Sequence, residues 1–336
     1  MDPLTHAVTG ATIALLISKP QQKKWAFFCG ILAATIPDLD VLIRSKENPL
    51  LTIQYHRHFT HSLFFVPLGA LIASWIVLFF ARQKITWKEL YLYCFFAYLT
   101  HPLLDAATSY GTHLLWPFTN DRVAWSIVPI VDPIPTVILL IGVIIGLMVQ
   151  RKAILVYSAS AFLLYLFLGA IQKNAVEDSL KELATSRGHS LVKYDVKPSV
   201  LQIIVWRTIY MDQGMIYVDA FHKVPFRKAV HYEGGKLPQY RYQNEKRVPA
   251  DSVASQDLKK FAFFSDDYVA VSPVDETFIG DIRFALLPHR TEPLWGVQID
   301  PANPERHLTF QNRRQMQPNS WEIFRKMICG LPIDSQ

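Results

Sequence analysis

The apolar residues of this chain are concentrated in its first half. Residues 1–172 contain several apolar runs of about bilayer-spanning length, whereas residues 173–336 have the mixed composition of a water-soluble region. A hydrocarbon core of about 30 Å needs about 20 helical residues, so these runs predict membrane-crossing helices. We therefore expect an all-α membrane bundle of about six transmembrane helices over residues 1–172, followed by a soluble α+β domain over residues 173–336.

The expected spans differ in length. The first is short, so it is either a full crossing or a tilted, partly submerged helix. Only 18% of the residues are charged, below the roughly 25% of ordinary soluble domains, which agrees with a membrane protein. The expected spans cover residues 4–18, 24–43, 61–81, 88–108, 132–149 and 153–172.

Lysine and arginine are unevenly distributed between the two sets of loops. If the helices alternate, one side receives eight basic residues and the other receives four before residue 173. The positive-inside rule makes the richer side cytoplasmic. The predicted orientation therefore places residues 173–336 outside the cytoplasm. The richer side contains Lys19, Lys23, Lys24, Arg82, Lys84, Lys88, Arg151 and Lys152, and the poorer side Arg44, Lys46, Arg57 and Arg122.

The second half mixes strand and helix patterns. Runs rich in β-branched and aromatic residues at 199–210 and 215–224 flank Asp212-Gln213-Gly214, a hairpin signal. Residues 268–271 and 277–287 read as further strands, and residues 252–264 and 320–330 have helical spacing. The histidines of this half follow no ligand spacing, and we expect ordinary surface or structural roles for His189, His222, His231, His289 and His307.

Charge and cysteine usage exclude other classes. The net charge of +6 is not arranged as a basic stripe with interleaved aromatic residues, so we expect no nucleic-acid partner and instead contact with membrane lipid. The three cysteines, Cys29, Cys94 and Cys329, make no disulfide framework. The first residues lack the basic region of a signal peptide, so we expect the first apolar segment to be retained.

Histidines and aspartates gather where the expected helices begin or end. In an alternating bundle these positions share one membrane face. A charged residue at membrane depth costs about 2.5–3.5 kcal/mol, so it normally has a partner or a function. The positions are His6, Asp38, Asp40, His56, Arg57, His58, His61, His101, Asp105, His113 and Asp132.

This donor set predicts a metal site. Neutral imidazole and carboxylate ligands suit zinc, and suit manganese or iron nearly as well. His101 and Asp105 are four residues apart, so both can face one ion from a helix. Asp38 and Asp40 cannot share a helical face, so one is expected as a ligand and the other as its supporting partner. The predicted ligands of one or two ions are His6, Asp38, His61, His101 and Asp105.

Three neighbouring residues are the predicted catalytic groups. Asp40 or His56 is expected to act as a general base or to orient a ligand, and Arg57 to hold an anionic group of the substrate. Whether His56, His58 or both reach the ion stays open. His113 and Asp132 are expected to be structural.

The ordered motifs also resemble a known family. Met1-Asp2-Pro3-Leu4-Thr5-His6 with Gly10, Pro-Asp-Leu-Asp at 37–40, His-Arg-x-x-x-His-Ser at 56–62 and His-Pro-x-x-Asp at 101–105 together resemble the YdjM-like family of inner-membrane metal-dependent hydrolases. This resemblance covers roughly residues 1–135. It implies a bacterial inner-membrane location and a bound metal, and it implies hydrolysis as the reaction class.

Two functions from different classes remain. The first is metal-dependent hydrolysis at the membrane interface, with a phosphoester of a lipid or lipid-linked envelope compound as the favoured substrate. The second is a non-catalytic membrane metal-binding or regulatory scaffold protein, because closed and open coordination look alike in sequence. Transport is disfavoured, since the deeper segments 63–80 and 137–149 carry no charge.

Overall fold

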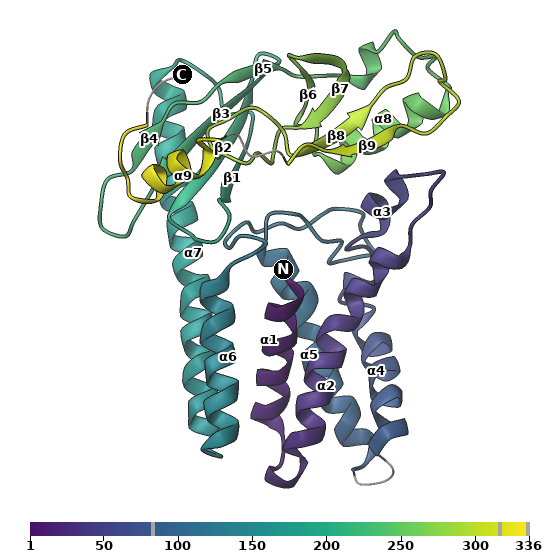
Figure 1. Cartoon of the computed structure of the whole chain (residues 1–336), viewed down its shortest axis with the longest axis vertical. Helices are drawn as coiled ribbons and strands as arrows, with labels where there is room; N and C mark the ends of the chain where they lie inside the picture. The colour runs from purple at the N-terminus through teal and green to yellow at the C-terminus, as the bar shows by residue number, and fades with distance from the viewer. Residues whose placement is uncertain (82–84, 315–317, 334–336) are drawn as a thin grey trace. The chain divides into compact units, whose positions relative to one another are not determined.

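The computed structural model describes residues 1–81, 85–314 and 318–333 (Figure 1). Its internal contacts divide the chain into two compact units. The helical unit contains Met1–Leu42, Tyr55–Ile171 and Val200–Ile203, and the α+β unit contains Ile43–Gln54, Gln172–Ser199 and Ile204–Gln336. The assignment of residues 1–172 to the membrane and of residues 173–336 to the extracytoplasmic solvent stays a prediction.

A helix forms over each expected apolar span. These helices are α1 (Pro3–Ile17), α2 (Lys23–Thr35) continued by the 3₁₀ helix η2 (Ile36–Leu42), α4 (Val66–Ala81), α5 (Trp87–Ala107), α6 (Pro133–Met148) and α7 (Lys152–Ser186). Shorter helical turns are η1 (Pro20–Gln22), α3 (Leu50–Tyr55) and η3 (Phe59–His61).

Local capping explains where three of these helices begin. Asp2 accepts a hydrogen bond from the backbone N–H of Thr5 at 3.0 Å, and Asp132 does the same for Ile134 at 3.0 Å. In both helices a proline follows the capping aspartate, where its fixed φ suits the first turn. Helix α5 begins with a reciprocal capping box between Thr86 and Glu89.

Small residues bring α1 and α2 into close contact. A side chain at Gly10 would collide with the backbone carbonyl of Gly30, and one at Gly30 would collide with the backbone of Gly10 and Ala11. Helix backbones approach this closely only where the facing residues are small. Helices α1 and α2 also pack on α5, and the buried interior shared by α1, α2, α4 and α5 includes Ala14, Cys29, Ala73 and Tyr98.

The helical unit provides two or three candidate membrane spans. In the part of the chain that the structure describes, Pro20–Leu42 and Lys152–Ser186 are the two helices long and apolar enough to cross a membrane. Leu50–His61 and Val66–Ala81, which meet at 85°, make a third if the bent pair is one span. Helices α1 and α6 are apolar but shorter. The predicted count of about six spans is therefore supported only in part.

The α+β unit contains two antiparallel sheets. One has the order β1-β2-β3-β4, with β5 paired to β3, and the other has the order β6-β7-β8-β9. The strands of the first sheet are β1 (Lys193–Pro198), β2 (Val205–Asp212), β3 (Met215–His222), β4 (Val230–Tyr232) and β5 (Lys236–Pro238). Those of the second are β6 (Val269–Ser272), β7 (Asp275–Asp281), β8 (Trp295–Gln298) and β9 (Thr309–Asn312), and the unit also holds η4 (Tyr242–Asn244), α8 (Val253–Phe264) and α9 (Ser320–Ile328).

The predicted elements of this half are confirmed with shifted ends. The β2–β3 hairpin turns at Gln213 and Gly214, both with positive φ, as the sequence signal predicts. Strand β2 begins only at Val205, because the chain turns before it at Leu201, whose φ of 71° is not an extended conformation. The strand expected over 277–287 ends at Asp281.

Candidate metal centre

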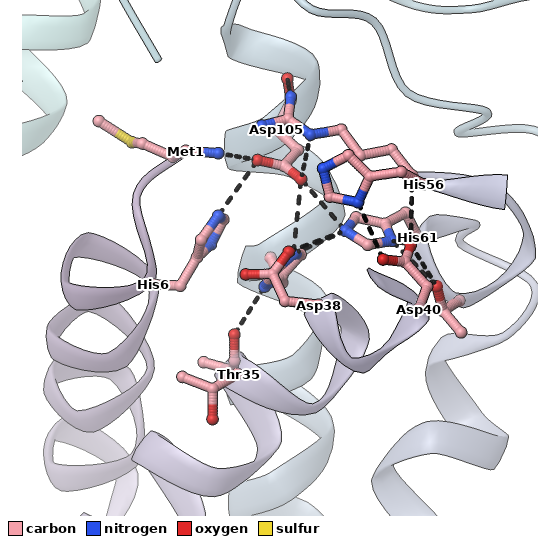
Figure 2. A network of polar contacts seen from close by, with 12 residues as sticks. Met1, His6, Thr35, Asp38, Asp40, His56, His61 and Asp105 are labelled. Carbon is pink, nitrogen blue, oxygen red and sulfur yellow. Dashed lines mark hydrogen bonds and ion pairs between the residues drawn. The ribbon is translucent and has the colours of Figure 1, made fainter. Parts of the chain in front are cut away.

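Four side chains from three helical segments converge at one end of the helical unit. Asp38 comes from η2, His61 from η3, and His101 and Asp105 from the last turns of α5. Each offers one ligand atom, and these four atoms all lie within 4.8 Å of one another. Figure 2 labels Asp38, His61 and Asp105 of this group. The His61, His101 and Asp105 side chains are fully buried, whereas that of Asp38 is 24% exposed.

The orientation of His101 depends on how α2 ends. Its Nδ1 lies 2.6 Å from the carbonyl oxygen of Ala34. Helix α2 passes into a 3₁₀ helix here, and the residue three positions after Ala34 is Pro37, which has no N–H to donate. The Ala34 carbonyl therefore accepts from the imidazole, which places the ring proton on Nδ1 and leaves Nε2 as a ligand atom.

His61 is oriented by a carboxylate. Its Nδ1 lies 3.2 Å from Oδ2 of Asp40 and 3.0 Å from the hydroxyl of Thr60. Asp40 also accepts hydrogen bonds from His56 Nδ1 at 2.9 Å and from the backbone N–H of Arg57 at 2.8 Å. This carboxylate–imidazole pairing is the arrangement that supports histidine ligands in metal sites.

The two imidazoles point their free nitrogens at each other. The Nε2 atoms of His61 and His101 are 2.9 Å apart, and two bare lone pairs repel at that distance unless a proton or a cation lies between them. Oδ2 of Asp105 is 3.2 Å and 3.4 Å from these two nitrogens, and Oδ1 of Asp38 is 3.5 Å from each. Two imidazole nitrogens and two carboxylates form a donor set that fits a divalent cation.

His6 lies beside this group rather than within it. Its Nε2 is 3.1 Å from Oδ1 of Asp105, and its ring stacks on His101 with 3.6 Å between the ring centroids. The side chain is fully buried, and Nδ1 has no hydrogen-bond partner in the described part of the chain. The amino nitrogen of Met1 also contacts Asp105. The ligand role of His6 stays a prediction.

Arg57 is buried against the cluster. It is 3% exposed, its Nε lies 3.1 Å from Oδ2 of Asp105, and it donates to the Thr108 hydroxyl at 2.9 Å. Its φ of 61° is in the left-handed region that non-glycine residues rarely adopt. The observed partner of its guanidinium is a carboxylate of the cluster, and the predicted contact with a substrate anion stays a prediction.

Arg57, with its left-handed backbone conformation, lies between His56 and His58 in the chain, and these two histidines point to different places. His56 reaches Asp40, and its side chain is 24% exposed. His58 instead packs on His113 and Trp116, with ring centroids 4.6 Å and 5.6 Å away. Burial and the nearby charge of Arg122 lower the pKa of His113 to about 3, so that this imidazole is neutral. Of the two histidines, His56 is thus the one that faces the cluster.

Asp132 lies at the start of α6. It caps α6 and accepts a hydrogen bond from the Tyr165 hydroxyl at 2.5 Å.

Three groups that the sequence did not reveal contact residues of the site. The Thr60 hydroxyl contacts His61, the Thr108 hydroxyl accepts from Arg57, and the Ala34 carbonyl accepts from His101. Pro37, three residues after Ala34 and without an N–H to donate, was the sequence signal that the Ala34 carbonyl is free to accept from a side chain.

These features define a membrane protein with a largely buried His/Asp cluster that can hold a metal ion. The family model of the YdjM inner membrane protein matches residues 1–176, more than half of the chain. The chain therefore belongs to the YdjM inner membrane protein family.

Two relatives are similar over part of the chain. "Inner membrane protein YbcI" of Escherichia coli (strain K12) is 29% identical over 131 residues, which cover 38% of this chain and 75% of that protein. "Uncharacterized protein YfhP" of Bacillus subtilis (strain 168) is 30% identical over 140 residues, 40% of this chain. The match covers only 42% of the length of the Bacillus protein. No solved structure matches the chain.

Proposed function

We propose that this protein is a membrane-bound metal-dependent hydrolase. The observation that carries the proposal is the approach of the His61 and His101 Nε2 atoms to 2.9 Å beside the carboxylates of Asp38 and Asp105. These four residues would hold the ion. Zinc suits the mixed nitrogen and oxygen donors best, and manganese or iron are the next choices. His6 would join them if the site holds a second ion.

The ion would lower the pKa of water toward about 7 and polarise a phosphoryl or carbonyl oxygen. The protein supplies the remaining functions. His56 is partly exposed, and its Nδ1 is held by Asp40, so Nε2 is the nitrogen available to take a proton from the attacking water. Arg57 holds Asp105 in place and adds positive charge beside the cluster.

An amphiphilic phosphoester is the proposed substrate class. The cluster lies at helix ends in a family of inner membrane proteins, which favours a reacting group near the lipid headgroups. A phospholipid or a lipid-linked envelope compound places a phosphoester at that depth. We place the cluster on the extracytoplasmic side, in line with the distribution of loop lysines and arginines. Arg82 and Lys84, on which this argument partly depends, lie outside the described residues.

One observation favours the non-catalytic alternative. Asp38, His61, His101 and Asp105 offer four ligand atoms, enough to complete a tetrahedral ion without water. In that case the ion would stabilise the bundle and the protein would serve as a metal-binding scaffold. The 24% exposure of both Asp38 and His56 argues for an open side and therefore for catalysis.

Hydrolysis by the purified full-length protein distinguishes these functions. We expect zinc-loaded protein to cleave fluorescent phospholipids or bis(p-nitrophenyl) phosphate, and chelation to abolish the activity. His56→Ala should lower the rate about 10²- to 10⁴-fold, because it removes the proposed base. His58→Ala is the matched control and should keep the rate. Activity that survives chelation, or a His56→Ala variant with the full rate, would contradict the proposal, and inactive metal-loaded protein would favour the scaffold.

A further inference from the structure

A cavity of about 620 Å³ lies within the α+β unit. Its walls come from β4 and the loop that follows it, from residues 289–292, and from residues just after α9. The volume is in the range of small-molecule sites, about 300–1,000 Å³. The cavity brings together His231 and His289, two of the histidines that follow no ligand spacing in sequence.

His231 is held by a buried carboxylate. Asp219 on β3 is 1% exposed and accepts a hydrogen bond from His231 Nε2 at 2.8 Å. The same carboxylate accepts two hydrogen bonds from Arg187, at 2.5 Å and 3.0 Å. Burial alone would raise the pKa of Asp219, but the hydrogen bonds from His231 and Arg187 lower it below its usual value. The ionised carboxylate fixes the ring, with a third of the His231 side chain left exposed at the cavity.

His289 reaches the same cavity as a neutral imidazole. It is 7% exposed, and its Nδ1 has no hydrogen-bond partner among the described residues. Burial and the charges of Arg290 and Arg207 lower the pKa of His289 to about 4. A neutral imidazole has one donor and one acceptor nitrogen, so this ring can exchange hydrogen bonds with a ligand hydroxyl without carrying a charge.

The fold builds this cavity wall from specific contacts. The buried guanidinium of Arg207 donates to the carbonyl oxygens of Pro288 and Arg290, at 2.8 Å and 2.7 Å, on either side of His289. A side chain at Gly234 would collide with the carbonyl oxygens of Val218 and His289, so this close approach requires glycine. The position of the His289 imidazole is therefore imposed by the core of the unit.

The balance of charge in the lining indicates the class of ligand. The charged residues of the lining are Arg290, Glu233 and Glu292, so the lining has no excess of positive charge that would hold a phosphate or carboxylate. The described residues with ligand atoms close enough for a metal ion are those of the Asp38 cluster, not of this cavity. The lining also contains the imidazoles of His231 and His289, the hydroxyl of Thr291 and the apolar side chains of Val230, Pro332 and Ile333.

We propose that this cavity binds a neutral, hydroxyl-rich ligand of the saccharide class. The polar groups of His231, His289 and Thr291 would exchange hydrogen bonds with ligand hydroxyls, and the apolar side chains of the lining would pack on the carbon face of a sugar ring. This inference stands on the α+β unit alone and is independent of the metal centre.

Saturation-transfer NMR on the full chain tests the proposal. The protein is kept in a polyoxyethylene detergent, which carries no sugar headgroup, and is probed with maltose, cellobiose and N,N′-diacetylchitobiose. We expect transfer to at least one of them. His289→Phe, which keeps a buried ring but removes both nitrogens, and Thr291→Val should each weaken binding by about tenfold or more. His307→Gln, elsewhere in the unit, is the matched control and should leave binding unchanged.

Circular dichroism confirms that each variant is folded before it is compared. The absence of transfer from all three saccharides to the wild-type protein would overturn the proposal. So would binding that both His289→Phe and Thr291→Val leave unchanged. Tighter binding of glucose 6-phosphate than of every neutral saccharide would also overturn it, because the site would then select an anion.

Discussion

His61 and His101 turn their Nε2 atoms toward each other, 2.9 Å apart, while the Nδ1 atom of each ring faces an oxygen. The Nδ1 acceptors are Asp40 for His61 and the Ala34 carbonyl for His101. Each ring uses Nδ1 for its oxygen partner, so the facing nitrogens need a proton or a cation between them, and the carboxylates of Asp38 and Asp105 stand beside them. The arrangement is stable when a cation lies among these four groups, and the following predictions depend on it.

Asp40 should affect metal affinity without being a ligand. Asp40→Asn weakens the acceptor that orients His61, and loss of such a supporting partner typically lowers metal affinity 10- to 100-fold. Competition with a chromophoric chelator measures the change. Asp132→Asn, which removes a buried carboxylate at another helix end, is the matched control and should keep the wild-type affinity. Equal metal affinities of the wild type, Asp40→Asn and Asp132→Asn would show that Asp40 does not support the site.

Arg57 should stabilise the metal-free protein more than the metal-loaded protein. Arg57→Gln leaves the buried carboxylate of Asp105 without its guanidinium, and breaking a buried ion pair costs about 3–5 kcal/mol. A cation at the site gives Asp105 another positive partner. Arg57→Gln should therefore lose less stability in the presence of zinc than in the presence of a chelator. Thermal unfolding under both conditions measures the difference. An equal loss of stability with and without zinc would mean that Asp105 does not contact the ion.

His289 should make the α+β unit sensitive to mild acid. Its pKa is lowered to about 4 in the folded protein, from 6.5 in the unfolded chain, so the unfolded chain binds more protons between these values. Stability is therefore full above about pH 6.5 and declines as the pH falls toward 4, by about 3 kcal/mol at most. His289→Gln should lose less stability than wild type between pH 7.5 and pH 5. Parallel pH profiles from thermal unfolding would contradict the buried, neutral state of this ring.

Orientation can be tested at exposed positions on opposite loops. In a chain with the native cysteines replaced by serine, Asp121→Cys should react with an impermeant maleimide added outside intact cells. Lys88→Cys should react only after permeabilisation, because the positive-inside rule places it in the cytoplasm. The reverse pattern would place the metal centre on the cytoplasmic side.

Apolar runs in the sequence predicted where the helices lie, and the structure adds local capping contacts that fix where three of them begin. Asp2-Pro3, Thr86 with Glu89, and Asp132-Pro133 act within a few residues of one another, so they specify helix starts without tertiary contacts. The i, i+4 spacing of His101 and Asp105 likewise follows from helix geometry alone.

The remaining details of the site depend on contacts between distant segments. The left-handed conformation of Arg57, which directs His56 to Asp40 and His58 away to His113, has no signature in the sequence because it depends on the surrounding structure. His231 on β4 and His289, in a loop more than fifty residues later, line the same cavity only because the chain folds back on itself. Such pairings cannot be read from local spacing.

The central claim is that the cluster holds a metal ion, and metal analysis of the detergent-purified protein tests it most directly. We predict one or two equivalents of divalent metal in the wild type, lost from His101→Ala and from Asp105→Ala and retained by His58→Ala. A wild-type protein without stoichiometric metal, or His101→Ala and Asp105→Ala variants that keep the full amount, would contradict the site described here.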